Sequence, residues 1–172
     1  NENSRFIFKS LIDELINIHN YNICYVTSNK DEQILNESNK KIKTFCIGEG
    51  TARTKFFLNL KANMLIMTMP DLETFYIKRS KTYPVHYVYF FHAMVSTHLV
   101  YRKNAFDHFD SIFCVGEYQI NEIRSTEKIY NLKPKNLVRC GYTHLDNLIK
   151  KYEKQNEKIS IDKNHNHILL AP

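Results

Sequence analysis

One histidine stands where a side chain could do acid–base chemistry. His92 ends the bulky apolar run YVYFFH and precedes the stretch that holds Ser96 and Thr97. In open parallel sheets, ligands bind beyond the carboxyl ends of the strands, where the chain turns towards a helix. An imidazole at such an end, partly removed from water by its apolar neighbours, can act as a general base near neutral pH. A histidine that only hydrogen-bonds a backbone carbonyl would show the same pattern, so both readings stay open here.

The polar residues beyond His92 also fit two roles. Ser96 and Thr97 can cap the start of a helix, or the free N–H groups at that start can bind a phosphate or an oxyanion. Arg102 lies further along and either belongs to a solvated face or supplies a positive charge to a substrate. Gly116 and Gly141 directly follow two other strand-like runs, SIFCV and NLVRC. They are therefore candidates for substrate-binding turns at the same edge of the sheet.

The sequence lacks the motifs that are typical of metal sites, cofactor sites and nucleic-acid binding. The remaining histidines show no HExxH pattern and no metal-ligand spacing with carboxylate support, so no metal site is predicted. Neither GxGxxG, GxxxxGK[ST] nor GxSxG occurs, and no cofactor is predicted. Basic residues are scattered among acids, while Tyr and Phe fall mostly inside apolar runs. This pattern argues against nucleic-acid binding.

Short apolar strands alternate with amphipathic helices along the chain. This rhythm predicts an α/β domain with a mainly parallel sheet flanked by helices. The expected strands are residues 22–28, 43–47, 62–69, 85–91, 111–115 and 136–140. The expected helices are residues 4–17, 51–60, 92–109, 117–130 and 143–157, with a short surface helix within 30–39.

Composition places the chain among folded proteins. Of its 172 residues, 43% are hydrophobic and 24% are charged, which excludes a disordered or collagen-like chain. No run approaches 18 consecutive apolar residues, so no membrane span is expected. The net charge of +6 suits an anionic partner, such as a phosphorylated molecule or an acidic lipid surface.

The two ends suggest a chain trimmed from a larger protein. A first lobe over residues 1–150 opens on a helix rather than on a strand. It leads into a charged linker over 151–166 and then into the apolar run HILLAP at 167–172. A single strand has no partner of its own, so we expect 167–172 to be the first strand of a second lobe.

The stretches YVYFFHAMVSTHLVYRKNAFDHFDSIFCVG and NLVRCGYTHLDNL give a more specific likeness. An aromatic strand enters a His-containing turn, an FD.FD segment precedes a strand that ends in Gly, and a GY..LD turn follows. In these features the chain resembles the CDP-glycerol:poly(glycerophosphate) glycerophosphotransferase family, the bacterial teichoic-acid and capsule polymerases. The matching residues are His92, Phe106, Asp107, Phe109, Asp110, Gly116, Gly141, Tyr142, Leu145 and Asp146. One departure is the turn His92-Ala93-Met94, where many members have His-Gly-Thr.

The resemblance implies a fold, a reaction and a set of partners. The fold would be GT-B, with two Rossmann-like lobes, and this chain would be the N-terminal acceptor lobe. The enzyme would transfer a glycerol-phosphate or related polyol-phosphate unit from a CDP-activated donor to a lipid-linked polymer, on the cytoplasmic face of an anionic membrane to which it binds peripherally. His92 would be the base. Ser96, Thr97, Arg102, Gly116 and Gly141 would serve substrate binding.

Two alternatives remain beside this reading. The chain could belong to another GT-B glycosyltransferase or sugar-nucleotide epimerase. It could also be a non-catalytic α/β module that binds a phosphorylated ligand.

Overall fold

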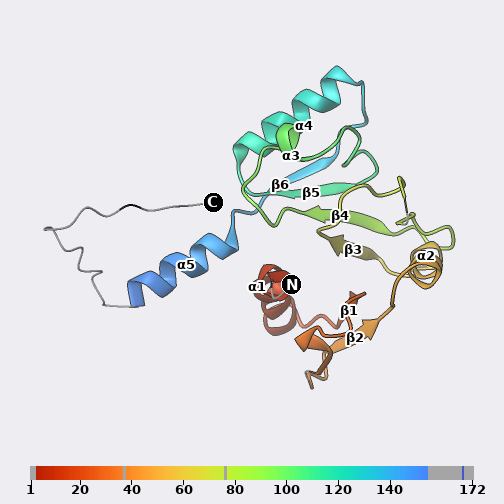
Figure 1. The fold of residues 1–172 in the computed structure, drawn as a ribbon, viewed down its shortest axis with the longest axis vertical. Coiled ribbons are helices and arrows are strands. Elements are labelled where there is room, and N and C mark those ends of the chain that lie inside the picture. The colour runs from red at the N-terminus through yellow and green to blue at the C-terminus, as the bar shows by residue number, and fades with distance from the viewer. Residues whose placement is uncertain (1–2, 37, 76, 155–167, 169–172) are drawn as a thin grey trace, which may run out of the picture.

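A four-stranded sheet forms the centre of the molecule (Figure 1). The computed structural model describes residues 3–36, 38–75, 77–154 and 168. In spatial order the strands are β3 (Met64–Met67), β4 (His86–Phe90), β5 (Ser111–Cys114) and β6 (Asn136–Arg139). All three neighbouring pairs are parallel. The predicted α/β class, with a parallel sheet flanked by helices and a Rossmann-like character, is confirmed.

The N-terminal strands form a second, smaller sheet. Strands β1 (Ile23–Thr27) and β2 (Ile42–Cys46) pair in parallel over their whole length. A single 3₁₀ turn, η1 (Gln33–Asn36), lies between them where a short surface helix was expected.

Five α-helices accompany these sheets in the described part of the chain. They are α1 (Asn3–Asn17), α2 (Thr51–Leu58), α3 (Thr97–Val100), α4 (Glu117–Ile129) and α5 (Thr143–Lys154). Figure 1 shows α3 and α4 together beside β5 and β6, whereas α5 extends away from the body of the molecule. None of the helices within the described ranges has the length and apolar run that a bilayer span requires.

Strand β4 is the core of the fold because both of its faces are covered. Tyr87, Val88 and Tyr89 are each at most 1% exposed. Successive side chains of a strand point to opposite faces, so Tyr87 and Tyr89 join one cluster with Ile123 of α4. On the other face, the Phe90 ring lies 5.6 Å from that of Phe8 in α1. An apolar strand buried on both faces is typical of parallel sheets.

The helix expected over residues 92–109 is wrong. Only Thr97–Val100 is helical, and the backbone of Tyr101 returns to an extended conformation. Asn104 adopts a left-handed conformation at φ 71°, which ends any helical continuation. The aromatic residues of this segment pack on β4: the Phe106 ring lies 4.8 Å from Tyr89, and the Phe109 ring 5.3 Å from it. Tertiary aromatic packing therefore overrides the helical pattern of this segment.

The expected linker and second-lobe strand lie largely outside the described residues. Residues 151–154 are the last turn of α5. Residues 155–167 and 169–172 are not described, so the strand expected at 167–172 is not described apart from Ile168.

Candidate functional site

The predicted site residues gather where the parallel strands end. Strand β4 ends at Phe90 and β6 at Arg139, so the turns with His92 and with Gly141 leave the same edge of the sheet. The two turns are in contact, because the Tyr142 hydroxyl donates to the His92 carbonyl oxygen at 3.3 Å. His92 itself is exposed. From the apolar strand before it, we expected an imidazole partly removed from water, but the His92 side chain is open to solvent. Its backbone is held by the contact with Tyr142.

A buried glutamine fixes the loop that follows His92. Gln119 of α4 is 0% exposed. Its side-chain amide donates to the Val95 carbonyl at 3.0 Å and accepts from the Val115 N–H at 2.8 Å. One side chain therefore joins the loop after β4 to the end of β5 and satisfies two backbone groups. Sequence reasoning missed Gln119; the signal was a polar residue in the first turn of a helix, facing the sheet.

Ser96 and Thr97 meet a carboxylate of the protein itself. The Ser96 hydroxyl donates to Glu122 Oε1 at 2.8 Å. The Thr97 hydroxyl and its backbone N–H both donate to Glu122 Oε2, at 2.7 and 2.6 Å. Ser96 also accepts from the His98 N–H, which caps α3. These groups are therefore engaged by α4, in the place where a substrate phosphate was expected to bind.

The same contacts shift the ionisation of Glu122. Burial by itself would raise the pKa of this carboxyl, but the hydrogen bonds from Thr97 and Ser96 outweigh it, and the pKa lies below its ordinary value. Charge-assisted hydrogen bonds favour the ionised form in this way. Glu122 is consequently a carboxylate at neutral pH and a positioning residue for the loop.

Arg102 connects two loops of the same edge. Its Nε lies 2.6 Å from Asp71 Oδ1, and its guanidinium stacks 4.3 Å from the centre of the Phe75 ring. Asp71 follows β3 in the chain, so this ion pair ties the loop after β3 to the segment after α3. The Arg102 side chain is 42% exposed. It keeps an accessible surface, although its charge is largely balanced by Asp71.

Gly116 and Gly141 occupy backbone positions at which a side chain would be unfavourable. Gly116 is the N-cap of α4 in an extended conformation, and a Cβ there would lie 3.2 Å from the Tyr118 ring. Gly141 has φ +76°, a left-handed conformation that a side chain disfavours. Nothing lies within 4 Å of a Cβ built at Gly141, so its requirement is conformational alone. Gly141 thereby lets the chain leave β6 and bring Tyr142 against His92.

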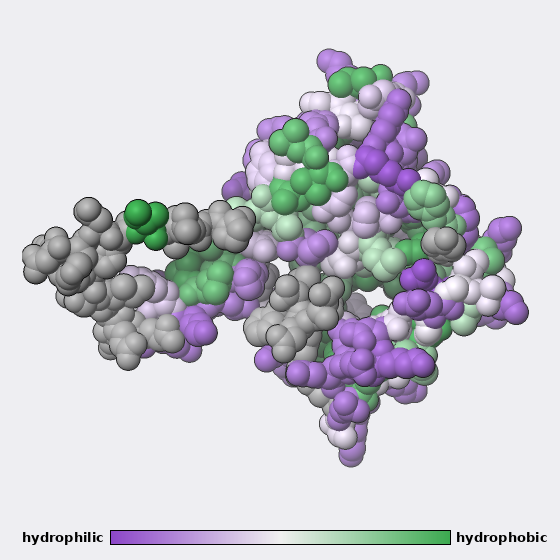
Figure 2. All heavy atoms as spheres, in the orientation of Figure 1, coloured by the Kyte–Doolittle hydropathy of each residue, from purple (hydrophilic) through white to green (hydrophobic). Residues whose placement is uncertain are grey.

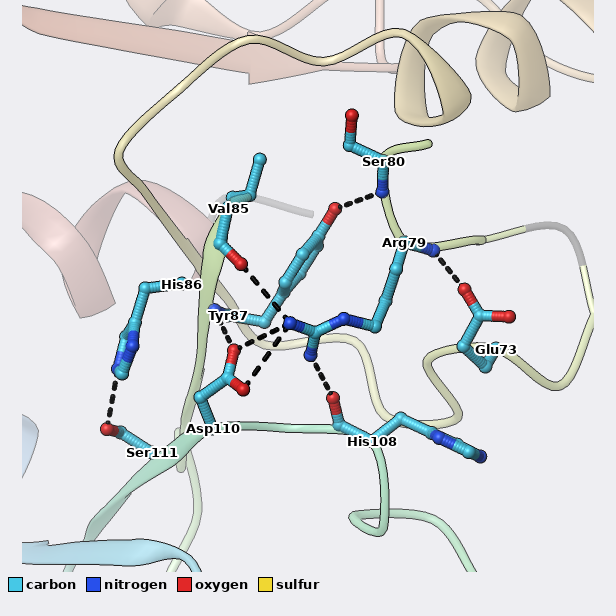
Figure 3. Close-up of polar contacts among 9 residues, drawn as sticks. All are labelled: Glu73, Arg79, Ser80, Val85, His86, Tyr87, His108, Asp110 and Ser111. Carbon is cyan, nitrogen blue, oxygen red and sulfur yellow. Dashed lines mark hydrogen bonds and ion pairs between the residues drawn. The ribbon is translucent and has the colours of Figure 1, made fainter. Parts of the chain in front are cut away.

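A second polar cluster occupies the opposite, amino edge of the sheet, shown in Figure 3. Asp110 of the FD.FD segment accepts from the Tyr87 N–H at 2.7 Å and pairs with Arg79 at 3.0 Å. Arg79 also donates to the carbonyl oxygens of Val85 and His108. The sequence reasoning did not single out Arg79. It anchors the FD.FD segment, so Asp110 has a structural role away from His92.

The carboxyl edge has few side chains that could act as a nucleophile or bind a metal ion. Burial raises the pKa of the Cys114 thiol to about 12, and burial also raises that of Cys140. Neither is a thiolate at neutral pH. Within the described residues, no three side chains of His, Cys, Asp or Glu gather as a metal ion would require. The imidazoles of His92 and His144 are exposed at this edge.

Comparisons of the chain with known protein families, with curated proteins and with solved structures find no match of any of these kinds.

Proposed function

We propose that this chain is the acceptor lobe of a glycerophosphotransferase-like GT-B enzyme. Such an enzyme moves a polyol-phosphate unit from a CDP-activated donor to a lipid-linked cell-surface polymer, on the inner face of the membrane. The observation that carries the proposal is the position of His92, exposed at the carboxyl end of β4 on a backbone held by Tyr142. The motif resemblance supports the choice of reaction, and the parallel α/β fold is compatible with it.

In this proposal His92 is the general base. Its imidazole takes the proton from the acceptor hydroxyl as that oxygen attacks the polyol-bearing phosphorus of the donor. A new P–O bond forms, the bond between the two donor phosphates breaks, and CMP leaves with the electron pair. A hydroxyl attacks phosphorus poorly while protonated, so a base within hydrogen-bond distance lowers the barrier.

The other predicted site residues take revised roles. Ser96 and Thr97 position the loop through Glu122 rather than contacting a phosphate. Arg102 offers its exposed face to a phosphate while Asp71 holds it in place. Gly116 and Gly141 shape the turns. The CDP group would be bound mainly by a second lobe.

Helix α5 supports the proposed membrane contact. Leu145, Leu148, Ile149 and Tyr152 recur at helical spacing and are each at least 41% exposed. In Figure 2 this region of the molecule shows a hydrophobic surface beside hydrophilic residues. Lys150, Lys151 and Lys154 lie on the same helix. Apolar and basic residues on one exposed helix suit the surface of an anionic bilayer.

Vesicle co-sedimentation tests this contact. The chain is expected to bind vesicles that contain phosphatidylglycerol and to bind phosphatidylcholine vesicles more weakly. Leu148→Glu removes an inserted side chain and is expected to weaken binding about tenfold. Ile129→Glu is the matched control, because Ile129 is 70% exposed but lies on α4. Equal binding of both variants would contradict the contact.

An activity assay tests the reaction. The full-length protein is expected to release CMP from CDP-glycerol or CDP-ribitol and to leave UDP-sugars unused. His92→Ala is expected to lower kcat about 100-fold or more with acceptor binding nearly intact. His19→Ala is the control, because His19 is an exposed histidine two residues after α1. Normal turnover by His92→Ala would refute the role of His92, and turnover of UDP-sugars would favour another GT-B transferase.

One observation favours the non-catalytic alternative. Among the described residues, no side chain forms a recorded hydrogen bond with the His92 ring, whereas catalytic imidazoles are commonly oriented by a carboxylate or a carbonyl. A phospho-ligand-binding module needs no such orientation. If that alternative holds, His92→Ala lowers the affinity for the ligand, and any activity falls in proportion to that loss of affinity.

A further inference from the structure

Arg139 is the last residue of β6 and lies at the carboxyl edge of the four-stranded sheet, the edge that carries His92. Its side chain is exposed. Within the described residues, its guanidinium forms no recorded hydrogen bond or ion pair. A guanidinium has several N–H donors and no acceptor. The donors of Arg139 are therefore available to an anionic ligand at this edge.

The charge of Arg139 is unbalanced, unlike that of the arginine predicted to bind substrate. Arg102 lies 2.6 Å from a carboxylate oxygen of Asp71, which offsets its charge. The carboxylates closest to Arg139 along the neighbouring elements are Glu117, which begins α4, and Asp146, in the first turn of α5. Neither forms a recorded ion pair with it in the described part of the chain. The net positive charge of this edge is thus centred on the end of β6.

Strand register places Arg139 on the side of the sheet that α4 covers. Arg139 is the register partner of Cys114 in β5, and paired residues of neighbouring parallel strands share a face. Cys114 belongs to the buried cluster that includes Ile123 of α4. Tyr142, three residues after Arg139, packs against the same cluster. Arg139 and Tyr142 therefore lie on one side of the sheet.

Tyr142 connects this side to two exposed imidazoles. Its hydroxyl donates to the His92 carbonyl at 3.3 Å, and its ring lies 5.9 Å from that of His144. The Tyr142 carbonyl accepts from the N–H groups of Leu145 and Asp146, which fixes the start of α5. The His144 side chain is exposed, and its imidazole forms no recorded hydrogen bond within the described residues. The turn after β6 thus holds a second free imidazole beside the His92 loop.

We propose that Arg139 and His144 bind a phosphate group of the acceptor beside His92, an inference that rests on the proposed function for the identity of the acceptor. A guanidinium can donate to a pair of phosphate oxygens at once, and an imidazole N–H can donate to another. His92 is then left free to take the proton from the acceptor hydroxyl. In a polyol-phosphate polymer, a phosphate lies only a few bonds from the terminal hydroxyl. Binding that phosphate therefore positions the hydroxyl for attack.

Calorimetric and NMR titration of the full chain with a water-soluble trimer of glycerol phosphate tests the site. The side-chain signals of Arg139 and His144 are expected to shift and saturate together. Arg139→Gln is expected to weaken binding about tenfold, the effect of losing a charge-assisted hydrogen bond. His144→Gln is expected to weaken it severalfold. Both side chains are exposed, so both variants are expected to keep the fold.

Two matched controls separate this site from diffuse electrostatic attraction. Lys128→Gln removes the same single positive charge from an exposed position on α4, and His108→Gln removes an exposed imidazole near the amino edge. Both are expected to bind the trimer as the wild type does. Equal weakening by Arg139→Gln and Lys128→Gln would overturn the proposal. So would the absence of trimer binding by the wild-type chain.

Kinetics of the full-length protein distinguish failure of this inference from failure of the proposed function. Arg139→Gln is expected to raise the KM for the acceptor about tenfold with kcat nearly unchanged, whereas His92→Ala lowers kcat. Transfer from a CDP-polyol with the same acceptor KM in Arg139→Gln and Lys128→Gln would refute the site and leave the proposed function intact. Trimer binding that depends on Arg139, without any transfer by the full-length protein, would refute the proposed function and leave the anion site.

Discussion

The two edges of the parallel sheet use polar residues in opposite ways. At the carboxyl edge, Ser96 and Thr97 are bound by Glu122 from within the protein, and His92 is left exposed. At the amino edge, the charged groups are paired within the protein: Arg79 with Asp110 at 3.0 Å, and Lys135 with Glu127 at 3.7 Å. One edge therefore leaves the imidazole of His92 open to solvent, and the other uses its charged groups to hold segments of the protein together. In the proposed function, the first edge carries the chemistry and the second anchors the fold.

Removing the anchor of the amino edge is expected to cost the most stability. Asp110→Ala leaves the Tyr87 N–H and the Arg79 guanidinium without their carboxylate. Because both groups lose a charged hydrogen-bond partner, we expect the free energy of unfolding to decrease by about 3 kcal/mol. Urea denaturation measures it.

Asp107→Asn is the matched control for that change, because Asp107 belongs to the same FD.FD segment but only its backbone N–H, and not its carboxylate, forms a hydrogen bond or ion pair within the described residues. It is expected to stay within about 0.5 kcal/mol of the wild type. Equal effects of the two substitutions would show that Asp110 does not anchor this edge.

The anchor of the carboxyl edge is expected to have the next largest effect. Gln119→Leu keeps the volume of the side chain but leaves the Val115 N–H and the Val95 carbonyl without their partner. Two buried backbone groups without hydrogen bonds predict a loss of about 2 kcal/mol. Urea denaturation gives this value, and NMR signals of residues 92–96 report whether the loop moves. A stable variant with an unchanged loop would mean that Gln119 does not hold it.

The sequence was sufficient to predict the strands and the edge of the sheet at which His92 lies. Both predictions depend on local patterns, namely apolar runs and the turns that follow them. It was insufficient for residues 92–109. There, Tyr101 and Phe106 pack on Tyr89 across the fold, and no local spacing distinguishes that arrangement from a helical face. The roles of Gln119 and Glu122 depend on α4 folding back over the loop. Such contacts between distant segments are not encoded in any one motif.

The Glu122 contacts should appear in the pH dependence of stability. The pKa of Glu122 is lowered in the folded protein, so its contribution is present above the ordinary value of 4.5 and is lost as the pH falls through the lower folded value. Glu122→Gln is expected to lose about 1.5 kcal/mol at pH 7. Its unfolding free energy should also fall less steeply than that of the wild type below pH 4.5. Parallel curves for the two proteins would exclude this contribution.

The smallest expected effect concerns the turn after β6. Gly141→Ala places a side chain at φ +76°, where space is open but the backbone conformation is disfavoured. The predicted loss is about 1 kcal/mol. Gly141→Asn is the control, since Asn tolerates left-handed conformations better and should lose less. Thermal unfolding of the two variants measures the difference, and the reverse order would remove the conformational argument.

The most direct test of the account is to locate the acceptor on the molecule. A short, water-soluble polyol-phosphate oligomer is titrated into the full chain while backbone and imidazole NMR signals are followed. The account predicts that the signals of His92, Gly116 and Tyr142 shift and saturate together, and that these shifts are absent in Gln119→Leu if the loop is displaced. Shifts confined to His86, His108 and Lys135 would contradict it, because the acceptor would then bind at the edge opposite His92.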